Sequence, residues 1–210
     1  LIATAVSLLL AVPLGLFTAI YLAEYARPDS RAVAAVRLTA ETLSGIPSII
    51  YGLFGMMFFV AYLRMGYSLL AGAATLSIMI LPLIMRTAEE ALLAVPQGYR
   101  EAAFGLGAGR LRTVFRIVVP AAMPGILAGV ILGIGRIVGE TAALIFTAGT
   151  VAGVPSSLLG SGRTLAVHMY ALSGEGLHTG EAFATAVALL LLVLAINGLS
   201  GCAARRLTKG

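Results

Sequence analysis

Charged residues are scarce in this 210-residue chain, and their scarcity argues against a soluble protein. Only 11% of the residues are charged and 60% are hydrophobic, and the mean hydropathy is +1.01. Soluble domains average about 25% charged residues. Cys202 is the only cysteine, so neither a disulfide framework nor a thiolate metal site is available. We expect Cys202 to lie buried near a helix end, where a free cysteine packs like a small apolar residue.

Sequence signatures of nucleotide binding and metal chemistry are also missing. No Walker A sequence occurs, and the glycine-rich run 105–109 follows no predicted strand, so we do not expect this chain to bind ATP. Asp29 is the only aspartate. His168 and His178 have no cysteine or carboxylate partners at metal-ligand spacing and are interpreted as ordinary loop residues. We therefore predict no metal site and no cofactor in this chain.

Long uncharged runs are abundant instead. They are Leu1–Ala23, Thr42–Leu63, Met65–Met85, Ile117–Gly135, Thr141–Gly162 and Ala182–Ala204. About 20 apolar residues span a bilayer as a helix, and these runs lack the strict alternation of a membrane β-barrel. The fold class is therefore all-α integral membrane. No methionine or basic leader precedes the first run, so we expect the chain to begin inside a transmembrane helix, with residues missing upstream.

Two of the runs flank the sequence GRIVGE (135–140) and form either two helices or one long helix. The stretch that follows Ala148 is rich in Gly, Ser and Pro, which favours one helix followed by an irregular loop. Five spans are then predicted, at about 1–24, 38–63, 67–88, 121–147 and 182–204, within a single membrane domain covering 1–210.

Basic residues are distributed unequally between the two sides of this five-span topology. One side holds ten of the 14 basic residues, the other holds Arg64 and Arg163, and Arg86 and Arg136 lie within spans. Because basic loops stay in the cytoplasm, the side with ten is predicted to be cytoplasmic, together with the C-terminus. A six-span topology divides the charges less cleanly. The net charge of +5 is thus a sign of membrane topology, and we expect no nucleic-acid partner.

The predicted cytoplasmic loop at about 95–120 has the pattern of a helical hairpin. A first helix is expected from Gln97 to Leu106, then a turn at 107–109, then a second helix that ends before Pro120. Tyr99, Ala103 and Leu106 share one helical face, and Leu111, Val114 and Phe115 share another. Such a hairpin either docks into a partner's groove or lies on the lipid surface.

This loop resembles the coupling loop of type I ABC importer permeases. It carries Glu101-Ala102-Ala103, then Gly107, then Ile117-Val118-Val119-Pro120, with Val119 where leucine is usual. The resemblance implies a five-span permease core whose loop sits on a separate ATPase subunit. The residues implied to form this coupling contact are Tyr99, Glu101, Ala102, Ala103, Gly107, Leu111, Ile117 and Pro120.

Arg136 and Glu140 are two charges inside the fourth predicted span. On one continuous helix they would lie on the same face, one turn apart, with Thr141 beside them. They form either a structural ion pair or the polar wall of a substrate pathway. Arginine suits a tetrahedral oxyanion, because its planar guanidinium donates two parallel hydrogen bonds.

The second span carries a possible opposite wall. Glu41, Ser44 and Ser48 recur at steps of three and four residues, and Pro47 is expected to kink the helix there. The alternative is a packing face of small residues. Gly125, Gly129 and Gly133 form a further ladder of small residues, which we interpret as a helix-packing face.

Three longer stretches resemble the permeases of the phosphate importer, its A-type subunit above all. They are 44–55, 135–149 and 164–173, with Ala143 where proline is often found. The resemblance implies that Arg136 and Glu140 lie on the phosphate path. It also implies partners: a cytoplasmic ABC ATPase dimer that binds ATP and Mg²⁺, a second homologous permease, an extracytoplasmic phosphate-binding protein, phosphate itself and membrane lipid.

Three alternatives remain. The cargo is another oxyanion, sulfate or molybdate; or the chain is an intramembrane enzyme acting on a lipid phosphate; or it is a scaffold without cargo. The enzyme requires a base, a nucleophile or metal-binding carboxylates near Arg136, and the fourth span offers only Glu140 and Thr141. The scaffold leaves the buried charges unexplained.

Overall fold

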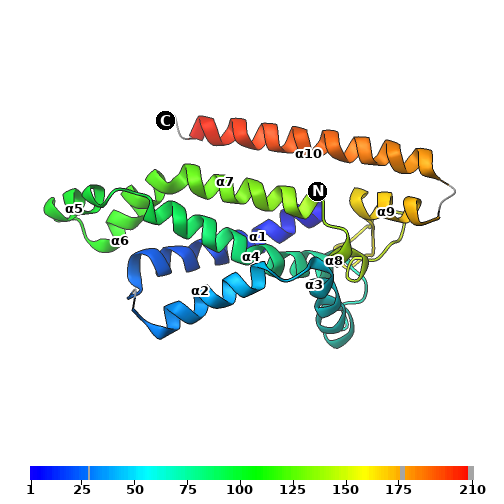
Figure 1. Ribbon diagram of the computed structural model, residues 1–210, viewed down its shortest axis with the longest axis horizontal. Helices are drawn as coiled ribbons and strands as arrows, with labels where there is room; N and C mark the ends of the chain where they lie inside the picture. The colour runs from blue at the N-terminus through cyan, green and yellow to red at the C-terminus, as the bar shows by residue number, and fades with distance from the viewer. Residues whose placement is uncertain (28, 176–177, 208–210) are drawn as a thin grey trace.

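The computed structural model describes residues 1–27, 29–175 and 178–207, and the described chain is helical with no strand. Within these described residues, four helical segments are long and apolar enough to cross a membrane. Figure 1 shows them running side by side along the longest dimension of the molecule. They are built from α1 (Ile2–Ile20) with the π-helical turn η1 (Tyr21–Tyr25), α4 (Leu69–Leu93), α7 (Val119–Val138) with the turns before it, and α10 (Thr179–Leu207).

The second predicted span, at about 38–63, is broken rather than kinked. Helix α2 (Arg31–Ser44) and the segment formed by α3 (Ser48–Gly55) and η2 (Met56–Tyr62) meet at an angle of 101°. Pro47 stands at the start of α3, where its missing N–H removes no helical hydrogen bond. The expected kink is therefore a full change of direction, and α2 begins seven residues before the predicted start of this span at 38. Counted as one span, the bent pair makes five.

The fourth span differs from the expected 121–147 at both ends. A continuous helical segment runs from Arg110 to Val138 through α6 (Arg110–Thr113), the π-helical turn η3 (Val114–Val118) and α7. The expectation that the second hairpin helix ends before Pro120 is thus wrong. The π-helical turn η3 lies just before Pro120 and already interrupts the regular α-helical hydrogen bonds. Pro120, which has no N–H to donate, is therefore tolerated without ending the helix. The segment ends at Gly139, and a separate short helix α8 (Ala142–Ile145) follows.

The glycine ladder on α7 packs against α4, as interpreted from the sequence. A Cβ at Gly125 would come within 2.6 Å of Ala91 Cβ, and one at Gly129 would overlap the Thr87 hydroxyl. These two glycines let the two helix backbones approach closely, as small residues do in membrane bundles.

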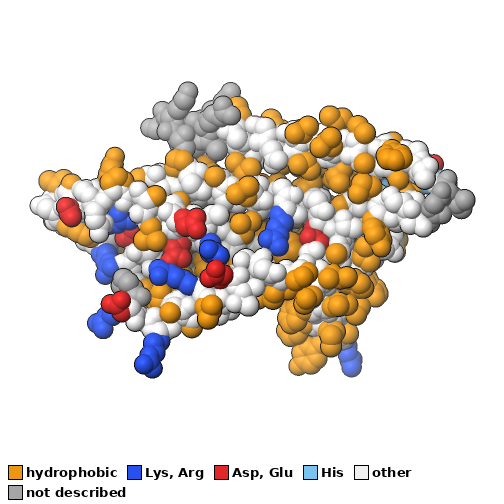
Figure 2. Space-filling model, in the orientation of Figure 1, with side chains coloured by type: hydrophobic (Ala, Val, Ile, Leu, Met, Phe, Trp, Pro, Cys, Tyr) orange, Lys and Arg blue, Asp and Glu red, His pale blue; other side chains and the backbone are white. Residues whose placement is uncertain are grey.

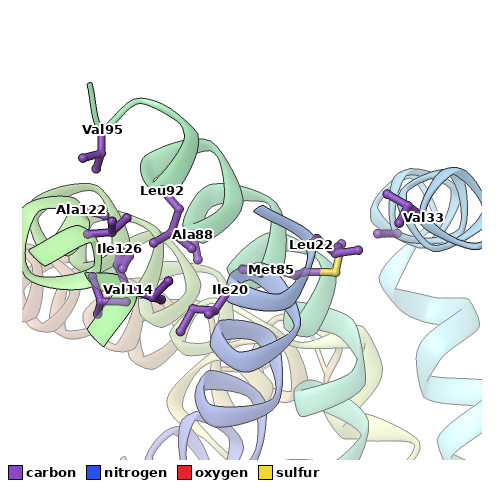
Figure 3. Packing of buried hydrophobic residues seen from close by; sticks show 14 residues of the cluster. Ile20, Leu22, Val33, Met85, Ala88, Leu92, Val95, Val114, Ala122 and Ile126 are labelled. Atoms are coloured by element: carbon purple, nitrogen blue, oxygen red, sulfur yellow. The ribbon is translucent and has the colours of Figure 1, made fainter. Parts of the chain in front are cut away.

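Buried apolar side chains join these helices near the end of the molecule that carries α5 and α6, called here the hairpin end (Figures 1 and 3). The cluster includes Ile20 and Leu22 from the first span, Leu92 from α4, and Val114 and Ile126 from the fourth span. Figure 2 shows that most of the visible charged side chains also gather toward this end.

Two further expectations concern the rest of the chain. Residues 149–164 form the expected irregular loop, but α9 (Leu165–Glu175) follows it and was not predicted. Cys202 is exposed and not buried, because α10 leaves most of its surface uncovered by the described chain.

Candidate functional site

The predicted coupling loop is a helical hairpin at the hairpin end. Helix α5 (Gln97–Gly105) ends within one residue of its predicted limit, and Gly107 turns the chain with φ of +79°. That conformation favours glycine, since it has no Cβ to clash. The Ala108 N–H donates to the Ala103 carbonyl at 3.0 Å and closes the turn, after which α6 begins at Arg110.

The division of the hairpin side chains into buried and exposed differs from the predicted helical faces. Ala103 and Val114 are buried, whereas their expected face partners Tyr99, Leu106 and Leu111 are exposed. Of the other predicted coupling residues, Ile117 is half-buried and the exposed ones are Glu101, Ala102, Gly107 and Pro120. The exposed surface of the hairpin therefore combines apolar side chains with the Glu101 carboxylate and the guanidinium groups of Arg112 and Arg116, while Ala103 is buried against the bundle.

A buried ion pair that the sequence reasoning missed holds this hairpin to the first span. The Arg100 Nε and Nη2 atoms lie 3.1 and 2.6 Å from Oε1 of Glu24, whose side chain is only 7% exposed. Arg100 also donates to the carbonyls of Leu92 and Val95 at 2.9 and 2.8 Å, which satisfies acceptors at the end of α4. The one sequence signal for this ion pair was the position of Glu24, an acidic residue directly after the first apolar run.

Arg110 adds a second connection to the same place. Its Nη2 donates to the Glu24 carbonyl, and its guanidinium lies 5.0 Å from the centroid of the Tyr25 ring. We call Glu24, Tyr25, Arg100 and Arg110 the latch. A separate pair, Arg37 and Glu89, joins α2 to α4 at 2.6 Å, with Arg37 44% exposed.

The predicted pathway residues at 136–141 do not share one helical face. The helix ends at Gly139, and within the described residues no ion pair joins Arg136 to Glu140. Oε1 of Glu140 instead accepts the Ala143 N–H at 3.1 Å and so caps α8. The alternative of an intrahelical ion pair is therefore wrong, because the helix on which it depended stops between the two residues.

Two broken spans meet beside Arg136. A Cβ on Gly52 of α3 would lie 2.9 Å from the Ala143 Cα of α8, so the two backbones are in close contact. The buried Tyr51 donates its hydroxyl to the Leu43 carbonyl at 2.7 Å, across the break between α2 and α3. Ile137, which follows Arg136 in the chain, packs in the same buried cluster as Tyr51 and Ala143. The break after α7 and the break before α3 thus come together around Tyr51.

Among the residues that the structure describes, those predicted to form the opposite wall of the pathway, on α2 and α3, make no polar contact with the region around Arg136. Ser44 donates its hydroxyl to the Glu41 carbonyl at 2.7 Å on α2, Glu41 is exposed, and Ser48 is half-buried at the start of α3. Across the described part of the chain, no hydrogen bond or ion pair links these three residues to Arg136, Glu140 or Thr141.

Chemically, the region around Arg136 offers a half-buried cation near polar groups at broken helix ends. Unwound backbone at such breaks is tolerated in membranes where it is buried in protein or lines a water-filled cavity. A guanidinium can donate paired hydrogen bonds to a tetrahedral oxyanion. The described residues contain no group of three or more His, Cys, Asp or Glu that could hold a metal ion.

The two histidines occupy different settings. Nδ1 of His168 on α9 is buried without a hydrogen-bond partner among the described residues. Nδ1 of His178 lies 3.4 Å from Oε1 of Glu181, on an exposed surface.

The fold is shared with solved transporter structures. The inward-facing methionine ABC transporter MetNI matches 99% of this chain and 90% of its own chain, with a TM-score of 0.75 and 22% identity.

The sequence has closer relatives. It is 35% identical over 208 residues to the probable ABC transporter permease protein YqgI of Bacillus subtilis, covering 91% of this chain and 70% of the relative. It is 36% identical over 200 residues to the phosphate transport system permease protein PstA 1 of Mycobacterium tuberculosis, covering 94% and 64%. The chain thus spans about two thirds of the length of these relatives. A family model also matches residues 11–209, and the chain belongs to the family of binding-protein-dependent transport system inner membrane components.

Proposed function

We propose that this chain is the permease subunit of an ATP-driven importer of inorganic phosphate and forms half of its translocation pathway. The observation that carries the proposal is its 36% identity to a phosphate transport system permease over 94% of the chain. The half-buried Arg136 beside two broken spans supplies the matching chemistry for an oxyanion.

The partners follow from this role. The exposed side of the hairpin docks on one subunit of a cytoplasmic ABC ATPase dimer, which binds ATP and Mg²⁺. A second homologous permease completes the pathway, and an extracytoplasmic binding protein delivers phosphate at the opposite face. The hairpin and the C-terminus are then cytoplasmic, in agreement with the excess of basic residues in the loops of that side. The chain itself catalyses no reaction.

The pathway role assigns different tasks to Arg136 and Glu140. Arg136 binds the phosphate oxygens transiently, because cargo that is held tightly is not released. Glu140 does not neutralise Arg136; its carboxylate fixes the start of α8 and thereby the backbone beside the arginine. Thr141 follows Glu140 in the chain and is the N-cap residue of α8.

Phosphate uptake by the reconstituted complex, with Arg136→Gln, tests the proposal. We expect an assembled complex that still hydrolyses ATP but has lost uptake. Arg64→Gln is the matched control, since Arg64 is an exposed arginine outside the broken-span region, and it should transport normally. Normal uptake by Arg136→Gln would remove Arg136 from the pathway. Uptake of sulfate or molybdate that is not inhibited by phosphate would show that the transported substrate is that oxyanion and not phosphate.

A further inference from the structure

The attachment of α5, the first helix of the hairpin, to the bundle depends on few apolar contacts. Ala103 is the one buried residue of α5. Beside α5 lies an open groove of about 680 Å³, lined on the hairpin side by Arg100, Glu101 and Phe104 and on the other side by Glu24 and Leu93. Because side chains do not fill this space, the polar bonds across it carry much of the attachment.

Those polar bonds join both arms of the hairpin to η1 and to the end of α4. Arg100 on α5 binds the Glu24 carboxylate of η1 and two carbonyls at the end of α4. Arg110, at the start of the fourth span, binds the Glu24 carbonyl from the other side of the hairpin turn. Both arms of the hairpin are thus tied to one residue of the first span.

The fourth span extends this connection through the membrane. One continuous helical segment runs from Arg110 to Val138 and carries Arg136 near its far end. At about 1.5 Å per residue, its 29 residues extend roughly 40 Å. A displacement of the hairpin therefore reaches the region around Arg136 if the hairpin and the ends of the spans move together.

We infer that the latch, through Glu24 and its bonds to Arg100 and Arg110, makes the hairpin and the adjoining ends of the first, third and fourth spans one rigid body that transmits ATPase movement to the pathway. Glu24, Arg100 and Arg110 are positioning residues in this inference, which rests on the proposed transport function. Without the latch, the ATPase would move the hairpin while the spans stayed behind, so ATP would be hydrolysed with less transport.

The test compares Glu24→Gln with Glu89→Gln in the assembled transporter. Both substitutions remove a nearly buried carboxylate from an ion pair with arginine, but only Glu24 binds the hairpin. For Glu24→Gln we expect phosphate transported per ATP hydrolysed to fall about fivefold or more, with ATP hydrolysis retained. For Glu89→Gln the ratio should stay at the wild-type value. An unchanged ratio in Glu24→Gln, or an equal fall in both variants, would overturn the inference.

Hydrogen exchange of the α5 amides gives a readout that is independent of the cargo. We expect faster exchange in Glu24→Gln than in Glu89→Gln, and equal exchange would contradict the latch even if the protein transports another substrate. A wild-type complex that transports no phosphate would refute the proposed function and leave this comparison intact. If Glu24→Gln does not assemble, Arg110→Lys serves instead, because it keeps the charge near Tyr25 and removes the guanidinium bond to Glu24. Its α5 exchange should be faster than that of Glu89→Gln, and equal exchange would overturn the inference.

Discussion

The hairpin end and the broken-span region around Tyr51 are held together in different ways. At the hairpin end, Glu24 and Glu89 are nearly buried and each is paired with an arginine from another element. Around Tyr51, buried apolar side chains and a close backbone contact between Gly52 and Ala143 join the elements, and within the described chain Arg136 takes part in no ion pair. Charge therefore attaches elements to one another at the hairpin end, whereas in the proposed function the charge of Arg136 binds the cargo.

The largest effect should come from breaking the latch at its arginine. Arg100→Ala leaves the Glu24 carboxylate buried without its charged partner, and removing one member of a buried pair costs about 3–5 kcal/mol. Arg37→Ala also removes the partner of a nearly buried carboxylate, Glu89, but it should cost less. Arg37 is 44% exposed, so water can take its place, whereas Arg100 is 13% exposed and also donates to two backbone carbonyls. Thermal unfolding of the two purified variants measures the difference. Equal losses would mean that the two ion pairs are energetically equivalent.

A smaller loss is expected where backbones touch. In Gly52→Ala the new Cβ lies 2.9 Å from the Ala143 Cα, and because that atom belongs to the backbone it cannot rotate away. Such overpacking costs about 1–3 kcal/mol. Gly98→Ala is the control, since nothing lies within 4 Å of a Cβ there and alanine favours the helix. A Gly52→Ala protein that unfolds at the wild-type temperature would show that α3 and α8 separate easily.

Tyr51→Phe tests the polar connection within the broken-span region. It removes the hydroxyl that donates to the Leu43 carbonyl, and a single hydrogen bond of this kind contributes about 1 kcal/mol. The exposed Tyr62 provides the comparison variant, Tyr62→Phe, which should leave the melting temperature unchanged. If both variants melt alike, the hydroxyl does not stabilise the break between α2 and α3.

The success of the sequence predictions depended on how local their signals were. The hairpin was predictable, because the spacing from Glu101 to Pro120 and the turn at Gly107 are local features. The latch was not, because no pattern in the sequence links Glu24 with Arg100, 76 positions later. The break at Gly139 was missed for another reason. Apolar residues continue after Thr141, so hydropathy alone favours one long helix, whereas the contact of α3 with α8 requires a change of direction.

The smallest expected loss of stability is that of Glu140→Gln. It distinguishes Glu140 as a helix cap from Glu140 as a charge partner of Arg136. As a cap, Glu140 needs only an oxygen that accepts the Ala143 N–H, and the amide of Glu140→Gln supplies one. We therefore expect Glu140→Gln to unfold within about 0.5 kcal/mol of wild type, whereas Glu140→Ala should lose about 0.5–2 kcal/mol, the usual cost of losing a cap. A charge partner of Arg136 would behave differently, because Gln and Ala both abolish the charge and would then cause similar losses. Thermal unfolding of both variants distinguishes these outcomes. Equal and large losses of stability would support the interpretation of Glu140 as the charge partner of Arg136. Uptake by Glu140→Gln then tests the charge alone, because the backbone beside Arg136 is still fixed by the cap.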